Sequence, residues 1–172
     1  MQITVTPRLV IRELVLEDAP FVLSILNTPG WIRFIGDRKV HDLAAAEQYI
    51  DTRFIYSYNT YGYGIYAIES SEGKLLGLCG LVKRDYLPHP DLGYALMPEN
   101  EGQGYAREAA AAVLRYAVET LGQKVIHAIV TPTNSRSVHL LEQLGFSFEK
   151  DIMDTGERLL LFSYHANGSA EQ

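Results

Sequence analysis

The stretch Glu101-Gly102-Gln103-Gly104-Tyr105-Ala106 decides the fold prediction. It follows a short apolar segment that Pro98 must end, and it opens a long amphipathic segment. Glycines let successive backbone N–H groups turn toward one side, and the start of a helix adds a partial positive charge. Because phosphate groups bind to such loops, the sequence predicts a pyrophosphate site here.

Two better-known phosphate loops differ from this one. A dinucleotide fingerprint requires a third glycine where Arg107 stands, and an acidic residue after the next strand, which here ends in Ile129-Val130. A P-loop requires Gly-Lys-Ser or Gly-Lys-Thr, which the loop lacks. Both classes are therefore excluded, and a glycine turn without a ligand stays as the plain alternative.

The segments on both sides of this loop read as strands and helices. Before it, hydrophobic patterns predict a strand over 8–14, a helix over 17–27, a loop over 27–31 and a helix that Asp42 caps. Strands over 64–69 and 74–83 form a hairpin at Gly73, and a short strand covers 91–96. After the loop come a helix over 106–121, a strand over 125–130, a helix over about 134–144 and strands over 146–152 and 158–164.

This order predicts one α/β (α+β) domain over residues 1–165. Its sheet is mixed and mostly antiparallel, with about seven strands flanked by about four helices. Residues 166–172 are expected to form a loose tail.

Composition narrows the class of protein. The chain has 172 residues, with 47% apolar and 21% charged residues, which suits one globular domain. The net charge is −6 and no basic run is present, so a nucleic-acid partner is excluded. The first residues lack the pattern of a secretory signal, and no apolar stretch is long enough to cross a bilayer. The sole cysteine, Cys79, suits a reducing compartment, so we expect a cytoplasmic protein without a membrane partner.

The quoted loop resembles the coenzyme A loop of the GNAT superfamily, Gln/Arg-x-x-Gly-x-Gly/Ala, except that Glu101 replaces the amide or basic residue. A second motif, Asn134-Ser135-Arg136-Ser137 followed by Leu144-Gly145-Phe146, is similar to another motif of that superfamily. The segments 8–12 and 91–94 extend the likeness to the ribosomal-protein N-acetyltransferase (RimJ/RimL-like) branch. The resemblance thus covers nearly the whole chain.

The resemblance implies that the chain uses acetyl-coenzyme A as co-substrate and needs no metal. The loop would bind the pyrophosphate, and Leu96 and Met97 would pair their backbone with the pantetheine arm like an added strand. Asn134 would hydrogen-bond the same arm, and it is also a good helix N-cap. The implied cofactor-binding residues are Leu96, Met97, Gly102, Gln103, Gly104, Tyr105, Ala106, Arg107 and Asn134.

The catalytic residues follow less directly from the family. Many members carry a tyrosine where Leu141 stands, and this tyrosine acts as the acid toward the departing thiolate. In this chain the nearest hydroxyl is that of Ser137. Ser137 could instead only cap or pack its helix. Asp91 matches a frequent acidic position and would take the proton of the incoming ammonium through water, whereas a solvated carboxylate at a strand end is the alternative. The histidines at 41, 89, 127 and 139 have no metal spacing and are expected to be structural or surface residues.

The implied reaction is direct attack of an amine on the thioester in a ternary complex. The expected acceptor is a protein or peptide N-terminal amine, for example on a ribosomal protein. A polyamine, an antibiotic or a small metabolite is the alternative acceptor, and a domain that binds coenzyme A without catalysis is the alternative function. Whether the protein forms a homodimer stays open.

Overall fold

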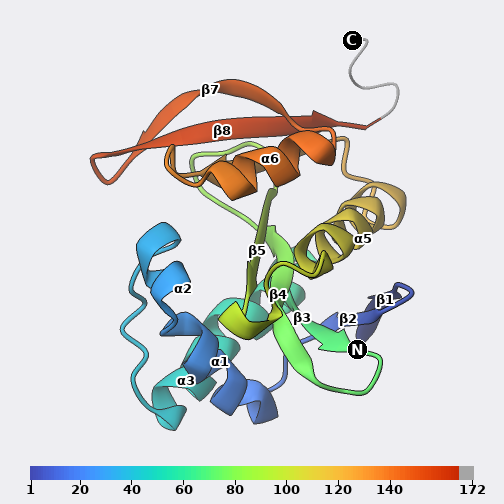
Figure 1. Cartoon of the computed structure of the whole chain (residues 1–172), viewed down its shortest axis with the longest axis vertical. Coiled ribbons are helices and arrows are strands. Elements are labelled where there is room, and N and C mark those ends of the chain that lie inside the picture. The colour runs from blue at the N-terminus through green and yellow to red at the C-terminus, as the bar shows by residue number, and fades with distance from the viewer. Residues whose placement is uncertain (167–172) are drawn as a thin grey trace.

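The strands of the described chain, residues 1–166, form one sheet in the computed structural model (Figure 1). Its order is β1-β2-β3-β4-β5-β6-β8-β7, and every neighbouring pair is antiparallel except β5 and β6. The strands are β1 (Gln2–Val5), β2 (Leu9–Glu13), β3 (Ile65–Ser70), β4 (Leu75–Val82), β5 (Asp91–Leu96), β6 (Val125–Val130), β7 (Ser147–Asp154) and β8 (Glu157–His165). The mixed, mostly antiparallel sheet predicted from the sequence is confirmed.

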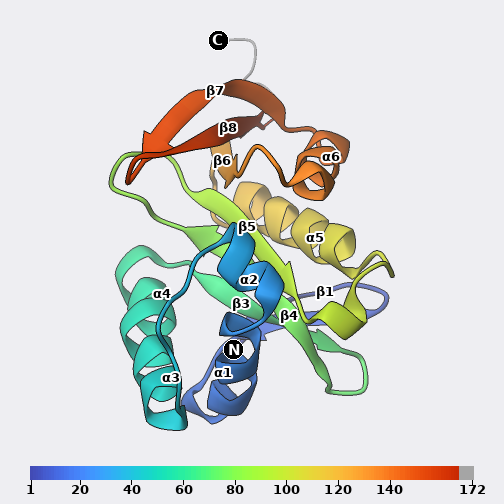
Figure 2. The same ribbon diagram turned by 60° about the vertical axis from the view of Figure 1, so that its left-hand side comes forward.

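Helices cover both faces of this sheet (Figure 2). One face carries α1 (Ala19–Leu26), α2 (Pro29–Phe34), α3 (Leu43–Tyr49) and α4 (Tyr56–Tyr61), and a π-helical turn over Ile50–Ile55 joins the last two. The other face carries α5 (Tyr105–Glu119) and α6 (Ser135–Gln143). Short 3₁₀ turns, Leu16–Asp18 and Pro98–Asn100, precede α1 and the glycine loop.

Each face has its own apolar core. On one side, Val22, Ile25, Ile50 and Phe54 from the helices pack against the sheet at Leu78 and its neighbours. On the other side, α5 buries residues spaced three and four apart along one helical face, among them Ala110, Val113, Leu114 and Ala117, and this spacing is the pattern that predicts the helix over 106–121. The helical periodicity therefore predicted the inward face of α5. In α3 the same pattern also places Leu43 inward, which is wrong, because this side chain is 51% exposed.

Two elements differ from the prediction. The segment predicted as a loop over 27–31 contains the start of α2, because the Thr28 side chain accepts a hydrogen bond from the Trp31 N–H and Pro29 lies at the first helical position. Proline is favoured there, since its missing N–H needs no partner. The strand β1 was not predicted, and it makes the sheet of residues 1–166 eight-stranded rather than seven-stranded.

The first residue of the predicted tail, Ala166, belongs to the folded domain. Ala166 is buried, and its N–H donates to the Lys124 carbonyl at 2.9 Å. The domain therefore includes this residue, and the rest of the predicted tail, 167–172, lies outside the described residues.

The sheet divides between β5 and β6. These parallel strands share one register pair, Asp91 with His127, although each strand has six residues. Beyond that pair, the two strands separate toward their carboxyl ends, and the loop that leads into α5 follows β5. Backbone groups of β5 that would face a neighbouring strand are therefore open on this side, which makes the division the natural place for an extended ligand.

Close backbone packing at Gly80 predicts a large loss of stability for Gly80→Ala. An ideal Cβ there would lie 2.2 Å from the Gly64 carbonyl oxygen and 2.6 Å from the Ile65 Cα, so the two strands would have to separate. We expect the free energy of unfolding in urea to fall by about 2 kcal/mol or more. The matched control is Gly93→Ala at its register partner, where nothing lies within 4 Å of the added Cβ. Equal stabilities for the two variants would contradict the packing argument.

Candidate active site

The glycine loop has the backbone conformation that the sequence predicted. Gly102 and Gly104 have φ of +80° and +83°, and Gly104 is the N-cap of the fifteen-residue helix α5. Residues other than glycine rarely adopt such φ values, so both positions favour glycine. No side chain caps this helix, and within residues 1–166 the N–H groups at its start have no hydrogen-bond acceptor: Gly104, Tyr105, Ala106 and Arg107. Unpaired N–H groups at a helix start are the donors that a pyrophosphate requires.

The unusual residue of the loop, Glu101, has a partner of opposite charge. Its carboxylate lies 3.9 Å from the guanidinium of Arg136 in the first turn of α6, and both side chains are largely exposed. Exposed pairs of this kind contribute little to stability. The contact does show that the loop and the second motif, which are more than thirty residues apart in the chain, lie side by side.

The second motif lies at the start of α6. Asn134 caps the helix, as predicted, by accepting a hydrogen bond from the Ser137 N–H at 3.3 Å. The Tyr94 hydroxyl of β5 donates to the Ser137 carbonyl at 3.4 Å, so one hydrogen bond spans the division between β5 and α6. Burial raises the pKa of Tyr94 to about 12, and the phenol therefore keeps its proton at neutral pH. Leu141, the residue at the position where the resemblance implied a tyrosine in many GNAT proteins, is buried in the core.

The backbone at the end of β5 offers one of the two predicted pairing residues to a ligand. The Met97 N–H donates to the Leu76 carbonyl of the hairpin side at 3.0 Å. Because backbone groups alternate between the two edges of a strand, those of Leu96 face the open side. The N–H of Met97 is thus already bonded, so of the two residues predicted to pair like an added strand only Leu96 has its N–H directed at the open side.

Asp91 lies at the point where β5 and β6 begin to separate, with 2% of its surface exposed. One carboxylate oxygen accepts from the Ile129 N–H at 3.3 Å, and the other pairs with the Arg84 Nε at 2.6 Å. The alternative of a solvated carboxylate is therefore wrong. Burial raises the pKa of Asp91 to about 6, although Arg84 and the Ile129 N–H oppose the rise.

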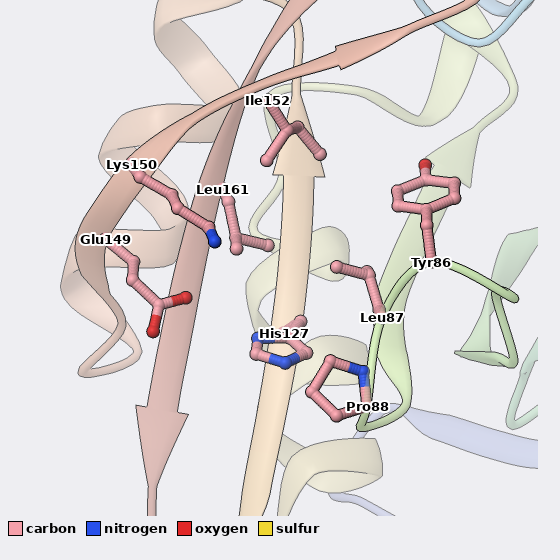
Figure 3. Close-up of a pocket in the computed structure, with 8 residues that line it drawn as sticks. All are labelled: Tyr86, Leu87, Pro88, His127, Glu149, Lys150, Ile152 and Leu161. Carbon is pink, nitrogen blue, oxygen red and sulfur yellow. The ribbon is translucent and has the colours of Figure 1, made fainter.

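A pocket of ≈ 180 Å³ is lined in part by His127 (Figure 3), which is the register partner of Asp91. The loop before β5 lines one side and strands β7 and β8 line the other, and the residues are Tyr86, Leu87, Pro88, His127, Glu149, Lys150, Ile152 and Leu161. His127 Nδ1 lies 2.8 Å from the Ser163 hydroxyl, which donates to Glu149 at 3.0 Å. Burial lowers the pKa of His127. A neutral, hydrogen-bonded imidazole fits the structural role predicted for it.

The described part of the chain contains neither a cluster of metal-ligating side chains nor a helix long and apolar enough for a membrane. In residues 1–166, no three side chains of histidine, cysteine, aspartate or glutamate come together as a metal site would require. None of the helices in the same range has the length and apolar character needed to span a bilayer. Cys79 is buried in β4, and burial raises the pKa of its thiol, which argues against a nucleophilic role.

Sequence reasoning missed two residues of this site, both arginines. Arg84 pairs with Asp91, and Arg8 donates to the Gln103 carbonyl of the glycine loop at 2.9 Å. No motif marks Arg84, and the segment 8–12 contains Arg8 without indicating its partner, because both contacts depend on how distant segments meet in the sheet. An arginine seven residues before a buried aspartate, with a loop between them, is at most a weak signal.

Comparison with known proteins agrees with this geometry. A family profile described as the acetyltransferase (GNAT) domain matches residues 8–147. The uncharacterised N-acetyltransferase p20 of Bacillus licheniformis is 26% identical over 90% of this chain and 87% of its own. The spermidine N(1)-acetyltransferase of Vibrio cholerae is 28% identical over 52% of each chain.

Solved structures share the whole fold. An acetyltransferase from Agrobacterium tumefaciens matches with a TM-score of 0.81 and 27% identity, over 96% of this chain and 95% of its own. The ribosomal-protein-S5-alanine acetyltransferase from Vibrio fischeri matches with a TM-score of 0.82 and 17% identity, over 98% of both chains. With a family match over most of its length and a glycine loop of the expected backbone conformation, the chain belongs to the GNAT acetyltransferase family, whose members are acetyl-coenzyme A-dependent acyltransferases.

Proposed function

We propose that this protein transfers the acetyl group of acetyl-coenzyme A to the α-amino group of a peptide or protein. The observation that carries the proposal is the buried carboxylate of Asp91, which lies where β5 and β6 separate and has a pKa of about 6. A base of this strength suits an amine that loses its proton near neutral pH. When bound, acetyl-coenzyme A supplies the activated acetyl thioester.

The residues at the division of the sheet fit this co-substrate. The unpaired N–H groups at the start of α5 would bind the pyrophosphate. The loop leaves room for it, because a Cβ added at Gly102 would have no heavy atom within 4 Å. The open backbone of Leu96 and the side chain of Asn134 would hold the pantetheine arm between β5 and α6. Gln103 would contribute through the loop backbone.

The two proposed catalytic residues, Asp91 and Ser137, would act on the incoming amine and on the departing thiolate. Asp91 would accept the proton of the incoming ammonium through a water molecule, because its carboxylate is held by Arg84 and Ile129. The Ser137 hydroxyl would donate a hydrogen bond to the departing thiolate. A thiolate is a modest leaving group, so a hydrogen bond can replace the stronger acid that a tyrosine would provide.

The strength of the base favours an α-amine over a lysine. An α-amino group has a pKa of about 7.7–8.0 and a lysine about 10.4, so deprotonating lysine costs roughly 3.5 kcal/mol more. Alkyl amines of a polyamine belong with lysine in this respect. The net charge of −6 would in addition steer a cationic protein toward the enzyme at low salt. We place the reaction in the cytoplasm, which suits the single, buried Cys79.

The acceptor class is tested with matched substrates. One peptide has a free N-terminus and no lysine, a second has a blocked N-terminus and one internal lysine, and spermidine is the third acceptor. We expect the first peptide to react at least 10-fold faster at pH 7.5, with a rate that falls as salt is added. A faster reaction of the lysine peptide would mean that a stronger base is present and that the N-terminal assignment fails.

A polyamine acceptor is the second candidate, and one observation favours it. The matches to curated relatives include spermidine N(1)-acetyltransferases, at an identity similar to that of the uncharacterised relative. The same assay decides, because a rate with spermidine that exceeds both peptide rates would assign the enzyme to small polyamines.

Removing the hydroxyl of Ser137 should lower turnover more than cofactor affinity. We expect Ser137→Ala to reduce kcat by about 10-fold, while the affinity for coenzyme A changes by less than 2-fold, because the hydroxyl acts as charge develops on sulfur. Stopped-flow thiol release and calorimetry measure the two quantities. The matched control is Ser135→Ala on the exposed side of the same helical turn. Equal turnover in Ser137→Ala and the parent would leave Ser137 as a packing residue.

A further inference from the structure

Arg8 joins the start of β2 to the glycine loop. Its Nε donates to Glu108 Oε1 at 2.7 Å, and its NH1 group donates to the Gln103 carbonyl at 2.9 Å. The guanidinium lies over the ring of Tyr105, 4.5 Å from the centroid. One side chain therefore contacts three groups at the start of α5: the Gln103 carbonyl, the Tyr105 ring and the Glu108 carboxylate. Arg8 is 95 residues away from Gln103 in sequence.

The bond to Gln103 determines which way the next N–H points. In a trans peptide the C=O and the following N–H lie on opposite sides of the peptide axis, and residues 1–166 contain no cis peptide. Because the Gln103 carbonyl is directed at Arg8, the Gly104 N–H must point the other way, toward the side left open at the loop. Without Arg8, the Gln103–Gly104 peptide could rotate and turn the Gln103 carbonyl oxygen toward the proposed phosphate site. The lone pairs of that oxygen would then repel the anion.

Glu108 holds Arg8 in place. This residue in the first turn of α5 also accepts hydrogen bonds from the Thr6 hydroxyl and from the Arg8 N–H. Burial acts to raise the pKa of Glu108, but the hydrogen bonds from Thr6 and Arg8 outweigh it and bring the pKa below its usual value. The carboxylate neutralises the guanidinium, so the effect of Arg8 on a bound anion would come mainly from geometry rather than from net charge.

We propose that Arg8 is a positioning residue for the pyrophosphate of the coenzyme, which acts by orienting the Gln103–Gly104 peptide so that its N–H faces the phosphate. This assignment concerns the cofactor side alone and does not depend on the identity of the acceptor. It also gives a role to the β1–β2 turn, because Thr6 and Arg8 lie in or beside this turn and both bind Glu108.

The test compares ligands with and without phosphate. Arg8→Met keeps an unbranched chain over Tyr105 and removes the donors. We expect its dissociation constant for coenzyme A, measured by calorimetry, to rise about 10- to 100-fold. This change corresponds to the loss of one charge-assisted hydrogen bond to the phosphate. Pantetheine, which lacks phosphate and is measured by competition, should bind within 2-fold of the parent. The matched control is Arg158→Met, which removes another Nε–carboxylate pair, to Asp151 at 2.9 Å.

Two results would overturn the proposal. One is unchanged affinity of Arg8→Met for coenzyme A, and the other is an equal loss for coenzyme A and pantetheine, which would indicate a general disturbance of the fold. If Arg8→Met is unfolded by circular dichroism, Arg8→Lys decides, because a single ammonium cannot reach Glu108 and Gln103 in the fork geometry of a guanidinium. We expect the phosphate-specific loss in Arg8→Lys as well, and parental affinity there would refute the positioning role.

Discussion

Gly104→Val is expected to weaken the binding of coenzyme A by about 100-fold or more while the protein stays folded. Gly104 has φ of +83°, a value that a β-branched residue avoids. An added Cβ would also lie 3.3 Å from the Arg8 guanidinium, so valine would disturb the contact that orients the loop. Moving two N–H donors away from the pyrophosphate removes two charge-assisted hydrogen bonds of about 1.5–3 kcal/mol each. At 1.4 kcal/mol for each factor of ten, the expected loss exceeds 100-fold.

Calorimetry with coenzyme A measures this effect, and Gly62→Val is the matched control. Gly62 caps α4 with φ of +80° and has open space around it. Valine there introduces the same backbone strain on the opposite face of the sheet. We expect the control to lose stability toward urea but to keep its affinity. Parental affinity in a folded Gly104→Val protein would refute the assignment of this loop to the pyrophosphate.

The parts of the fold that could be predicted are those with strong local signals. The bounds of β5 and β6 agree with the prediction to the residue, because Pro98 and the turn residues around each strand end them sharply. The hairpin turn at Gly73 has φ of +87°, as a glycine at that place implies. The loop before α5 follows from its glycines and from the amphipathic helix behind it.

The remaining parts depend on contacts between distant segments. The four residues of β1 are too few to predict a strand alone, and they are ordered by pairing with β2. The sequence pattern places Pro29 in a loop, whereas the cap formed by Thr28 makes it the first residue of a helix. For the site, the motif positions were predictable, but the ion pair of Arg84 with Asp91 and the contact of Arg8 with Gln103 required the sheet to bring them together.

Asp91→Asn should lower kcat/KM by about 100-fold or more and remove an inflection from its pH profile. General bases contribute about 10²–10⁴-fold to rate, and asparagine keeps the shape and an acceptor for the Ile129 N–H but cannot take a proton. The pKa of Asp91 is raised to about 6, so the carboxylate is protonated below that pH. Activity of the parent should therefore rise as pH increases through about 6. The profile of the variant should keep only the inflection of the acceptor amine, near 7.7–8.0.

Arg84→Gln identifies the group that causes the inflection. The guanidinium lowers the pKa of Asp91 against the effect of burial, so its removal should move the inflection above 6. A shift in Arg84→Gln, together with loss of the inflection in Asp91→Asn, would assign the titration to this carboxylate.

The pH dependence of the free energy of unfolding gives an independent check. Because the folded pKa is above the usual 3.8, ionisation of Asp91 opposes folding, and parental stability should decline between about pH 4 and pH 6 by an amount that Asp91→Asn removes. If Asp91→Asn keeps the parental rate and inflection, Asp91 serves only to hold β5 and β6 at their point of separation, and another group is the base.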